Sequence, residues 1–148
     1  MKPEFWLTIR GRQQYDGREP DEIELTTEAT LTDEGGVLWL SYAESPLTGL
    51  EGTTTTFEIR KDKIILRRKG AVKNEMEFSV GEVHKSLYDF GQGAFLLTVR
   101  TTSIDDRMTV DGGTLVVAYR LDLEGIGSGE VEYRMEAKRK DPAAHRAD

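Results

Sequence analysis

The chain has 148 residues, no cysteine, and a net charge of −7 from 27 acidic and 20 basic side chains. This length suits a single domain that buries a real core, and the absence of cysteine excludes disulfides, thiolate nucleophiles, iron–sulfur clusters and cysteine-ligated zinc. The negative charge opposes binding to nucleic acid or to anionic lipid.

The N-terminal residues carry Phe5, Trp6 and Leu7 between charges and form no apolar signal segment. No stretch approaches the roughly 18 apolar residues that a membrane-spanning helix needs. We therefore expect a cytoplasmic protein with no membrane span. Residues 1–140 are expected to form one domain, and the polar tail over residues 141–148 is expected to be disordered.

Apolar residues recur at period two through most of the chain, a pattern that predicts strands. In residues 21–32 and 130–138, apolar side chains alternate with charged and other polar ones, so each strand has one wet face. Turn residues, mostly glycine-rich, separate the apolar runs. The predicted strands cover residues 4–13, 21–32, 36–43, 53–60, 63–69, 75–79, 83–90, 94–110, 113–124 and 130–139.

The strand predicted over residues 94–110 changes phase. Its apolar positions are odd up to Val99 and even from Ile104, which predicts a bulge near Thr101–Ser103. Short connections imply an antiparallel up-and-down meander, and closure protects the edges of a meander that has no covering helices. We predict an all-β barrel of about eight to ten strands. Helix content should be little, apart from a turn or short helical lid at Pro46–Gly52.

The central part of the chain carries several coordinated motifs. It reads E-S-P-L-T-G-L-E-G-T-T-T-T at residues 44–56, R-K-G-A-V-K-N at 68–74, F-S-V-G at 78–81 and S-L-Y at 86–88. These motifs resemble those of the YwiB-like proteins of bacteria, and the resemblance runs from about Phe5 to Ala137. It implies a calycin-like barrel related to lipocalins. Because that family is uncharacterised, with no agreed catalytic or binding residues, the resemblance brings no active site to this chain.

A group of polar residues crowds into the same region and is expected to meet at one end of the barrel. In a structural interpretation, Glu44 and Glu51 pair with Arg68 or Lys73, and the threonines at 53–56 only build a strand. In a ligand interpretation, the interior holds one small molecule, and the polar group fixes its polar head. The candidate polar residues are Glu44, Thr48, Glu51, Arg68, Lys73, Asn74, His84 and Tyr88, and the expected apolar lining is Phe57, Ile59, Leu66, Phe78, Leu97 and Leu121.

Catalytic and metal-binding chemistry finds little support. His84 with Glu44 or Glu51 is the minimum set for acid–base work, but nothing supplies a matching nucleophile. The other histidine, His145, lies in the tail, so no multi-histidine metal site is expected. No cofactor is expected either, because the glycine run at 125–129 has the context of a hairpin and not of a nucleotide loop.

Three functions stay open at this point. The first is non-covalent binding of a small, partly apolar ligand or acyl chain in or at the mouth of the barrel. The alternative is a protein-interaction module with a solid core, which uses a strand edge or the Leu47–Leu50 loop. The third is a weak enzyme that uses His84, although the sequence favours a protein that is not an enzyme. A homodimer is also open, because closed barrels can pair through many surfaces.

Overall fold

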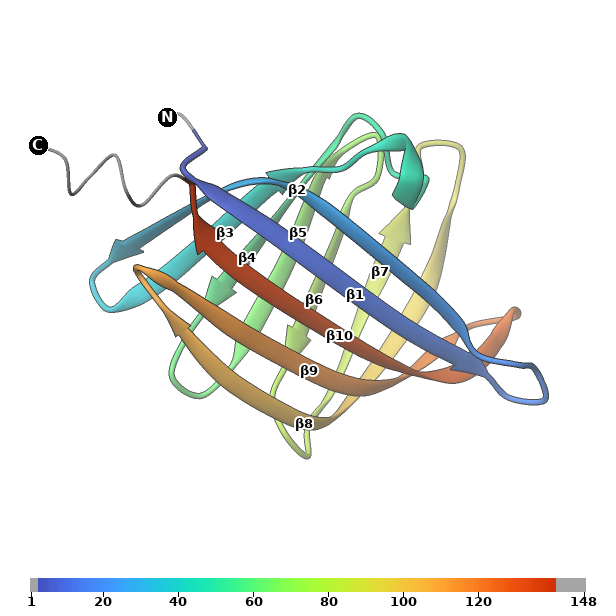
Figure 1. Ribbon diagram of the computed structural model, residues 1–148. Helices are drawn as coiled ribbons and strands as arrows, with labels where there is room; N and C mark the ends of the chain where they lie inside the picture. The colour runs from blue at the N-terminus through green and yellow to red at the C-terminus, as the bar shows by residue number, and fades with distance from the viewer. Residues whose placement is uncertain (1–2, 141–148) are drawn as a thin grey trace, which may run out of the picture.

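The computed structural model describes residues 3–140, which form ten antiparallel strands and one short 3₁₀ helix (Figure 1). Each predicted strand has its counterpart, with ends that agree within a few residues. The predicted tail, 141–148, lies outside the described residues. The elements are β1 Phe5–Tyr15, β2 Asp21–Glu34, β3 Val37–Ala43, η1 Pro46–Thr48, β4 Thr53–Ile59, β5 Ile64–Gly70, β6 Asn74–Phe78, β7 Val83–Asp89, β8 Ala94–Thr109, β9 Gly112–Leu123 and β10 Gly127–Arg139.

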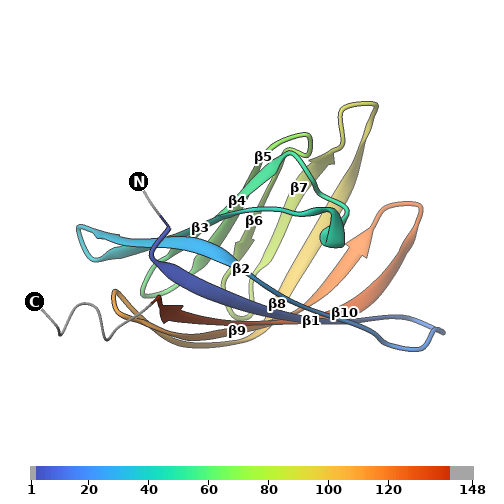
Figure 2. The same ribbon diagram turned by 45° about the horizontal axis from the view of Figure 1, so that its top comes forward.

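The strands follow one another around a barrel wall, and the first strand pairs with the last. The order is β6-β5-β4-β3-β2-β1-β10-β9-β8-β7. β1 and β10 pair antiparallel along their length, from Phe5 opposite Arg139 to Tyr15 opposite Gly129. Figure 2 shows the wall curving around a common interior. The predicted all-β class, the up-and-down meander and the low helix content are therefore confirmed.

The wall is open along a seam between β6 and β7. The barrel is therefore nearly closed, whereas the sequence predicted a fully closed one. At one end of the seam, Lys73 and Asp89 form an isolated bridge through N–O hydrogen bonds of 2.8 and 2.9 Å. Further along, the Glu77 N–H donates to the Nδ1 of His84 at 3.3 Å, so a side chain replaces a backbone partner. β6 is the shortest of the strands, which limits how far it can pair with β7.

The bulge predicted in β8 is confirmed. The register with β9 shifts between Thr101 and Ser103, and the Thr102 hydroxyl donates to the carbonyl of Ala118 at 2.9 Å. On one side of the shift Val99 and Thr101 are buried, and on the other Met108 is buried. The extra residue therefore keeps the apolar face of a long strand turned inward as the strand curves.

The core consists of inward-facing rows of side chains that cross neighbouring strands. Leu40, Phe57, Leu66 and Met76 are paired in register from β3 to β6 and are all buried. Ile9, Met135 and Leu115 form an equivalent row from β1 through β10 to β9. Because both sides of the wall contribute such rows, the apolar side chains meet inside the barrel.

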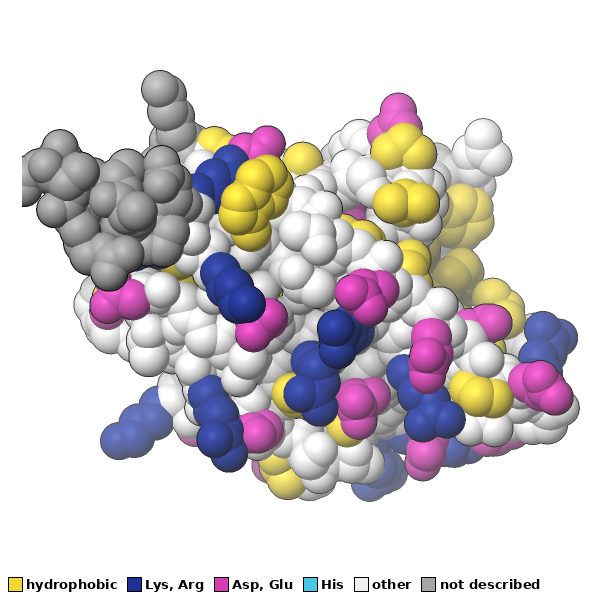
Figure 3. Space-filling model, in the orientation of Figure 1, with side chains coloured by type: hydrophobic (Ala, Val, Ile, Leu, Met, Phe, Trp, Pro, Cys, Tyr) yellow, Lys and Arg dark blue, Asp and Glu magenta, His cyan; other side chains and the backbone are white. Residues whose placement is uncertain are grey.

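The outer face of β1, β2 and β10 is the wet face that the alternation predicts. Figure 3 shows Lys and Arg interspersed with Asp and Glu on this side of the molecule. Cross-strand ion pairs contribute to the pattern, such as Arg10 with Glu24 at 3.2 Å. Across residues 3–140, no helix combines the length and the apolar character needed to cross a bilayer.

Candidate functional site

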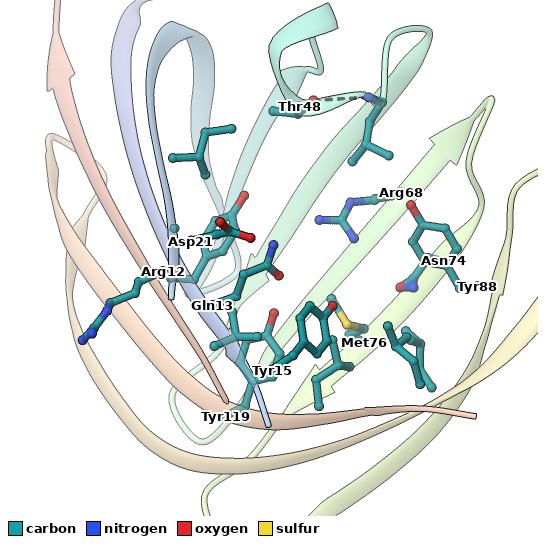
Figure 4. Close-up of a pocket in the computed structure, with 18 of the residues that line it drawn as sticks. Arg12, Gln13, Tyr15, Asp21, Thr48, Arg68, Asn74, Met76, Tyr88 and Tyr119 are labelled. Carbon is teal, nitrogen blue, oxygen red and sulfur yellow. Dashed lines mark hydrogen bonds between the residues drawn. The ribbon is translucent and has the colours of Figure 1, made fainter. Parts of the chain in front are cut away.

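A pocket lies at the end of the barrel where the connections after the odd-numbered strands meet. In an up-and-down meander these connections share one end, and here they include the β3–β4 connection with η1. The pocket has a volume of about 460 Å³ and is lined by side chains from both halves of the wall (Figure 4). Figure 2 shows the β3–β4 connection, with its short helix, at this end of the barrel.

The β3–β4 connection is shaped by its own sequence. Ser45 caps η1 by accepting a hydrogen bond from the Leu47 N–H at 3.3 Å, and Pro46 starts the helix. Gly49 ends it with a φ of 76°, a conformation that glycine adopts without strain. Thr48 is held by its hydroxyl, which donates to the Ser45 carbonyl at 3.0 Å. The stretch predicted to form a turn or short helical lid, Pro46–Gly52, thus contains a short helix at Pro46–Thr48, and Thr48 lines the pocket.

A polar row of side chains crosses the barrel beside the pocket, and two of its members, Arg68 and Asn74, line the pocket. Tyr42, Thr55, Arg68 and Asn74 are paired in register across β3, β4, β5 and β6. They face the interior because each lies two residues from a member of the buried apolar row described above, and side chains in a strand alternate between faces. Tyr42, Thr55 and Asn74 are buried, and Arg68 is partly buried. We call these residues the polar row.

The polar row divides into a satisfied half and an unsatisfied half. The Tyr42 hydroxyl lies 3.1 Å from that of Tyr133, and the Thr55 hydroxyl donates to the carboxylate of Glu44, itself only 8% exposed. The Nε of Arg68 and both polar side-chain atoms of Asn74 are buried and have no hydrogen-bond partner within residues 3–140. Figure 4 shows Arg68 reaching into the pocket, with Asn74 and Tyr88 on the same side.

Burial controls the charge of the tyrosines around this row. Desolvation raises the pKa of Tyr42, Tyr119 and Tyr133 above the ordinary tyrosine value. The positive charge of Arg68 acts in the opposite direction on the pKa of all three, because it favours a phenolate. Burial is the larger effect, so these hydroxyls stay protonated and neutral near neutral pH.

The side of the pocket formed by β8 to β10 is mainly apolar, whereas β1 and β2 contribute charged side chains. Tyr119 and Tyr133 form its floor, since their rings pack on Phe78 and Phe57 of the core at centroid distances of 4.8 and 6.0 Å. Leu97 and Leu121 line the pocket as the ligand interpretation expects. The other expected lining residues lie in the packed core and do not line the pocket, namely Phe57, Ile59, Leu66 and Phe78.

The structure separates the candidate polar residues into two sets. Those that line the pocket are Glu44, Thr48, Arg68, Asn74 and Tyr88. Those that do not are Glu51, Lys73 and His84. Whether the first set binds a ligand stays a prediction.

The residues of the second set have other positions. Glu51 is exposed in the turn before β4. Lys73 takes part in the backbone bridge across the seam, and His84 faces Glu77 there, with its Nε2 3.9 Å from the Glu77 carboxylate. The predicted pairing of His84 with Glu44 or Glu51 is wrong, because Glu77 is its acidic neighbour.

The structural interpretation of Glu44 and Glu51 is also wrong in its detail. Neither glutamate pairs with Arg68 or Lys73 among the ion pairs of residues 3–140. The threonines are more than strand filler, because the Thr55 hydroxyl bonds Glu44 and the Thr53 hydroxyl accepts from the Val72 N–H at 3.2 Å.

The sequence interpretation missed the tyrosines. Tyr42, Tyr119 and Tyr133 are not among its candidate residues, although a tyrosine at an inward position, unlike a phenylalanine, brings a hydroxyl that needs a partner. A hydroxyl at an inward-facing position is the feature of the sequence that could have indicated these tyrosines. Among residues 3–140, no group of three or more His, Asp or Glu side chains is arranged to hold a metal ion.

These features define a nearly closed, ten-stranded antiparallel β-barrel with a pocket of mixed polarity at one end. Residues 7–137 match the family model described as "Domain of unknown function (DUF1934)", and the chain belongs to this family. The fold is similar to that in the crystal structure of the ywiB protein from Bacillus subtilis, with a TM-score of 0.83, 22% identity and 95% of each chain covered. The YwiB-like resemblance is thereby confirmed. No curated protein matches the chain.

Proposed function

We propose that this protein binds a small, partly apolar molecule or acyl chain, non-covalently, in the pocket at the end of the barrel. The observation that carries the proposal is the pocket of about 460 Å³, which is lined by apolar side chains from β8 to β10 and by the buried polar side chains of Glu44 and Asn74. Pockets for small molecules have this character, a mainly apolar lining with a few polar groups that fix orientation.

The competing hypotheses receive less support. A protein-interaction module with a solid core does not account for an interior pocket, although Leu47 on η1 is 74% exposed, as that hypothesis requires. A weak enzyme based on His84 lacks a site, because His84 lies away from the pocket and its Nδ1 accepts a backbone hydrogen bond. A homodimer and a cytoplasmic location stay predictions.

The proposal is tested with N-phenylnaphthylamine, an uncharged apolar dye that fluoresces on leaving water. We expect saturable binding to the wild-type protein. Leu97→Trp, which fills the pocket from β8, should weaken binding at least about tenfold. Val110→Trp adds the same side chain at an exposed position in the β8–β9 connection, at the other end of the barrel, and should leave binding unchanged.

The proposal is contradicted if the wild-type protein does not bind the dye, or if both variants bind it as the wild type does. Native mass spectrometry of the protein purified from cells gives a second measurement that needs no variant. It should detect a bound small molecule whose mass disappears after denaturation.

A further inference from the structure

The pocket offers a ligand two polar side chains, those of Arg68 and Asn74. They are direct cross-strand partners on β5 and β6, so their side chains leave the same face of the sheet as neighbours. Both line the pocket. In a native barrel almost every buried polar atom has a hydrogen-bond partner, yet the Nε of Arg68 and the amide of Asn74 have none within residues 3–140. Asn74 is only 7% exposed, so leaving its amide without a hydrogen bond destabilises the folded state.

Within the described residues, the charge of Arg68 also lacks a direct counter-ion. A guanidinium stays protonated at any ordinary pH, and Arg68 is not among the ion-paired arginines of the described chain. The neighbouring tyrosines do not neutralise it, because burial keeps them protonated. A partly buried cation that has no anionic partner within residues 3–140 is a favourable place for an anion.

The acidic groups around the pocket have other contacts or positions. Glu44 accepts the hydrogen bond of Thr55. On the β1–β2 side of the pocket, Glu22 pairs with Arg12 at 3.6 Å, and Asp21 begins β2 at an exposed position. These groups lower the overall attraction for anions, so an anion must be recognised by direct contact with Arg68 and not by the general field of the pocket.

We propose that the ligand is a monocarboxylic acid with an apolar tail, whose carboxylate binds the guanidinium of Arg68 and the amide of Asn74. The proposal rests on the proposed function and names its ligand class. The two N–H groups along one edge of a guanidinium match the two oxygens of a carboxylate. One arginine neutralises the single charge of a carboxylate but leaves a phosphate monoester partly uncompensated. The tail would lie on the mainly apolar side of the pocket, along Leu97, Leu121 and Val131.

Three probes with the same alkyl chain separate the contribution of the head from that of the tail. Octanoate, octanol and octylamine present an anionic, a neutral and a cationic head. Isothermal titration calorimetry at neutral pH should show octanoate binding to the wild type about tenfold or more tighter than octanol, because a charge-assisted hydrogen bond adds to the same tail contacts. Octylamine should bind most weakly of the three.

Arg68→Met removes the charge while keeping an apolar side chain of similar length. It should weaken octanoate binding about tenfold or more and leave octanol binding unchanged or slightly tighter. Lys69→Met is the matched control, because it removes the same charge from the next residue of β5, which is exposed on the other face of the strand. It should keep the preference of the wild type for octanoate.

The outcomes distinguish this inference from the proposed function. If octanol binds the wild type as tightly as octanoate does, or if Arg68→Met leaves octanoate binding unchanged, the carboxylate inference is wrong and the pocket still binds apolar molecules. Tighter binding of octylamine assigns the head group to the acidic side chains and also overturns the inference. If none of the probes binds the wild type, the carboxylate inference is wrong, and binding of the dye then decides whether the proposed function fails with it. The comparison of the three probes needs no variant, so it holds even if a variant does not fold.

Discussion

At the scale of single residues, Glu58 is a buried charge whose role differs from that of the surface carboxylates. It is 2% exposed on β4 and receives a hydrogen bond of 2.6 Å from Arg67 and a second from Arg60. The hydrogen bond from Arg67 holds the pKa of Glu58 below the ordinary glutamate value, with Arg60 adding to the effect and burial opposing it. A buried carboxylate with two arginine partners should therefore stabilise the folded state.

We expect Glu58→Gln to lower the free energy of unfolding by about 1–3 kcal/mol at neutral pH, because both arginines lose a charged acceptor. Glu24→Gln is the control, since Glu24 pairs with Arg10 on the exposed surface and its loss should cost less than about 1 kcal/mol. Denaturant unfolding monitored by tryptophan fluorescence measures both. Equal losses in the two variants would show that burial adds nothing to the Glu58 interactions.

The contribution of Glu58 should depend on pH. Because its pKa is lower in the folded chain than in the unfolded chain, its contribution is fully present above the ordinary glutamate pKa and is lost as the pH falls through the folded-state value. The difference in stability between the wild type and Glu58→Gln should therefore shrink in the acid range. A difference that stays constant or grows as the pH is lowered would contradict this assignment.

Gly70 is required by the close approach of two chain segments beside the site. Its φ is 126°, and a Cβ placed there would lie 2.2 Å from the carbonyl oxygen of Gly52. We expect Gly70→Ala to destabilise the fold by about 2–4 kcal/mol, from backbone strain together with the clash. Gly17→Ala, at a φ of 81° with open space around it, should cost only about 1–2 kcal/mol. Equal costs, measured by denaturant unfolding, would mean that the clash is relieved by local movement.

The residue types predicted the charged and amide residues of the site better than the tyrosines at its floor. Glu44, Arg68 and Asn74 could be selected because charged and amide side chains stand out in an apolar pattern. Tyr119 and Tyr133 were not selected, because alternation alone treats an inward tyrosine like a core phenylalanine and only the hydroxyl distinguishes the two. His84 was selected for its chemistry alone, and the face it occupies depends on the seam, which the sequence pattern does not contain.

At the scale of strands and connections, the seam between β6 and β7 is the weakest part of the wall. The Lys73–Asp89 bridge and the Glu77–His84 contact are its described hydrogen bonds, apart from the turn that joins the strands. We expect the backbone amides of β6 and β7 to exchange with solvent faster than those of β1 and β10, which are paired on both sides. Hydrogen exchange measured by NMR tests this order, and equal protection of the two pairs would contradict an open seam.

The period and phase of the apolar residues predicted the strands well, but they did not predict how fully consecutive strands pair. Strict alternation placed β2 and β10, and the change of phase after Val99 placed the bulge of β8, because both follow from which face is buried. The seam was missed because β6 and β7 follow each other in the chain like any other predicted hairpin. Whether they pair depends on the curvature of the whole wall and not on their own residues.

At the scale of the whole molecule, the meander brings the odd-numbered connections to one end and divides the interior there into two walls. The polar row crosses β3 to β6, and the apolar side chains come mainly from β8 to β10. The part of the sequence that carries the family motifs thus forms the polar wall, while residues far along the chain form the apolar one. This division is why we propose a ligand with one charged end and one apolar end.

The most direct test of this account is a crystal structure of the protein with octanoate. We predict that its carboxylate lies within about 3 Å of the guanidinium of Arg68, with Asn74 beside it and the alkyl chain against Leu97 and Leu121. The account is contradicted if the pocket holds no octanoate at saturating concentration, or if the molecule binds with its carboxylate directed away from Arg68.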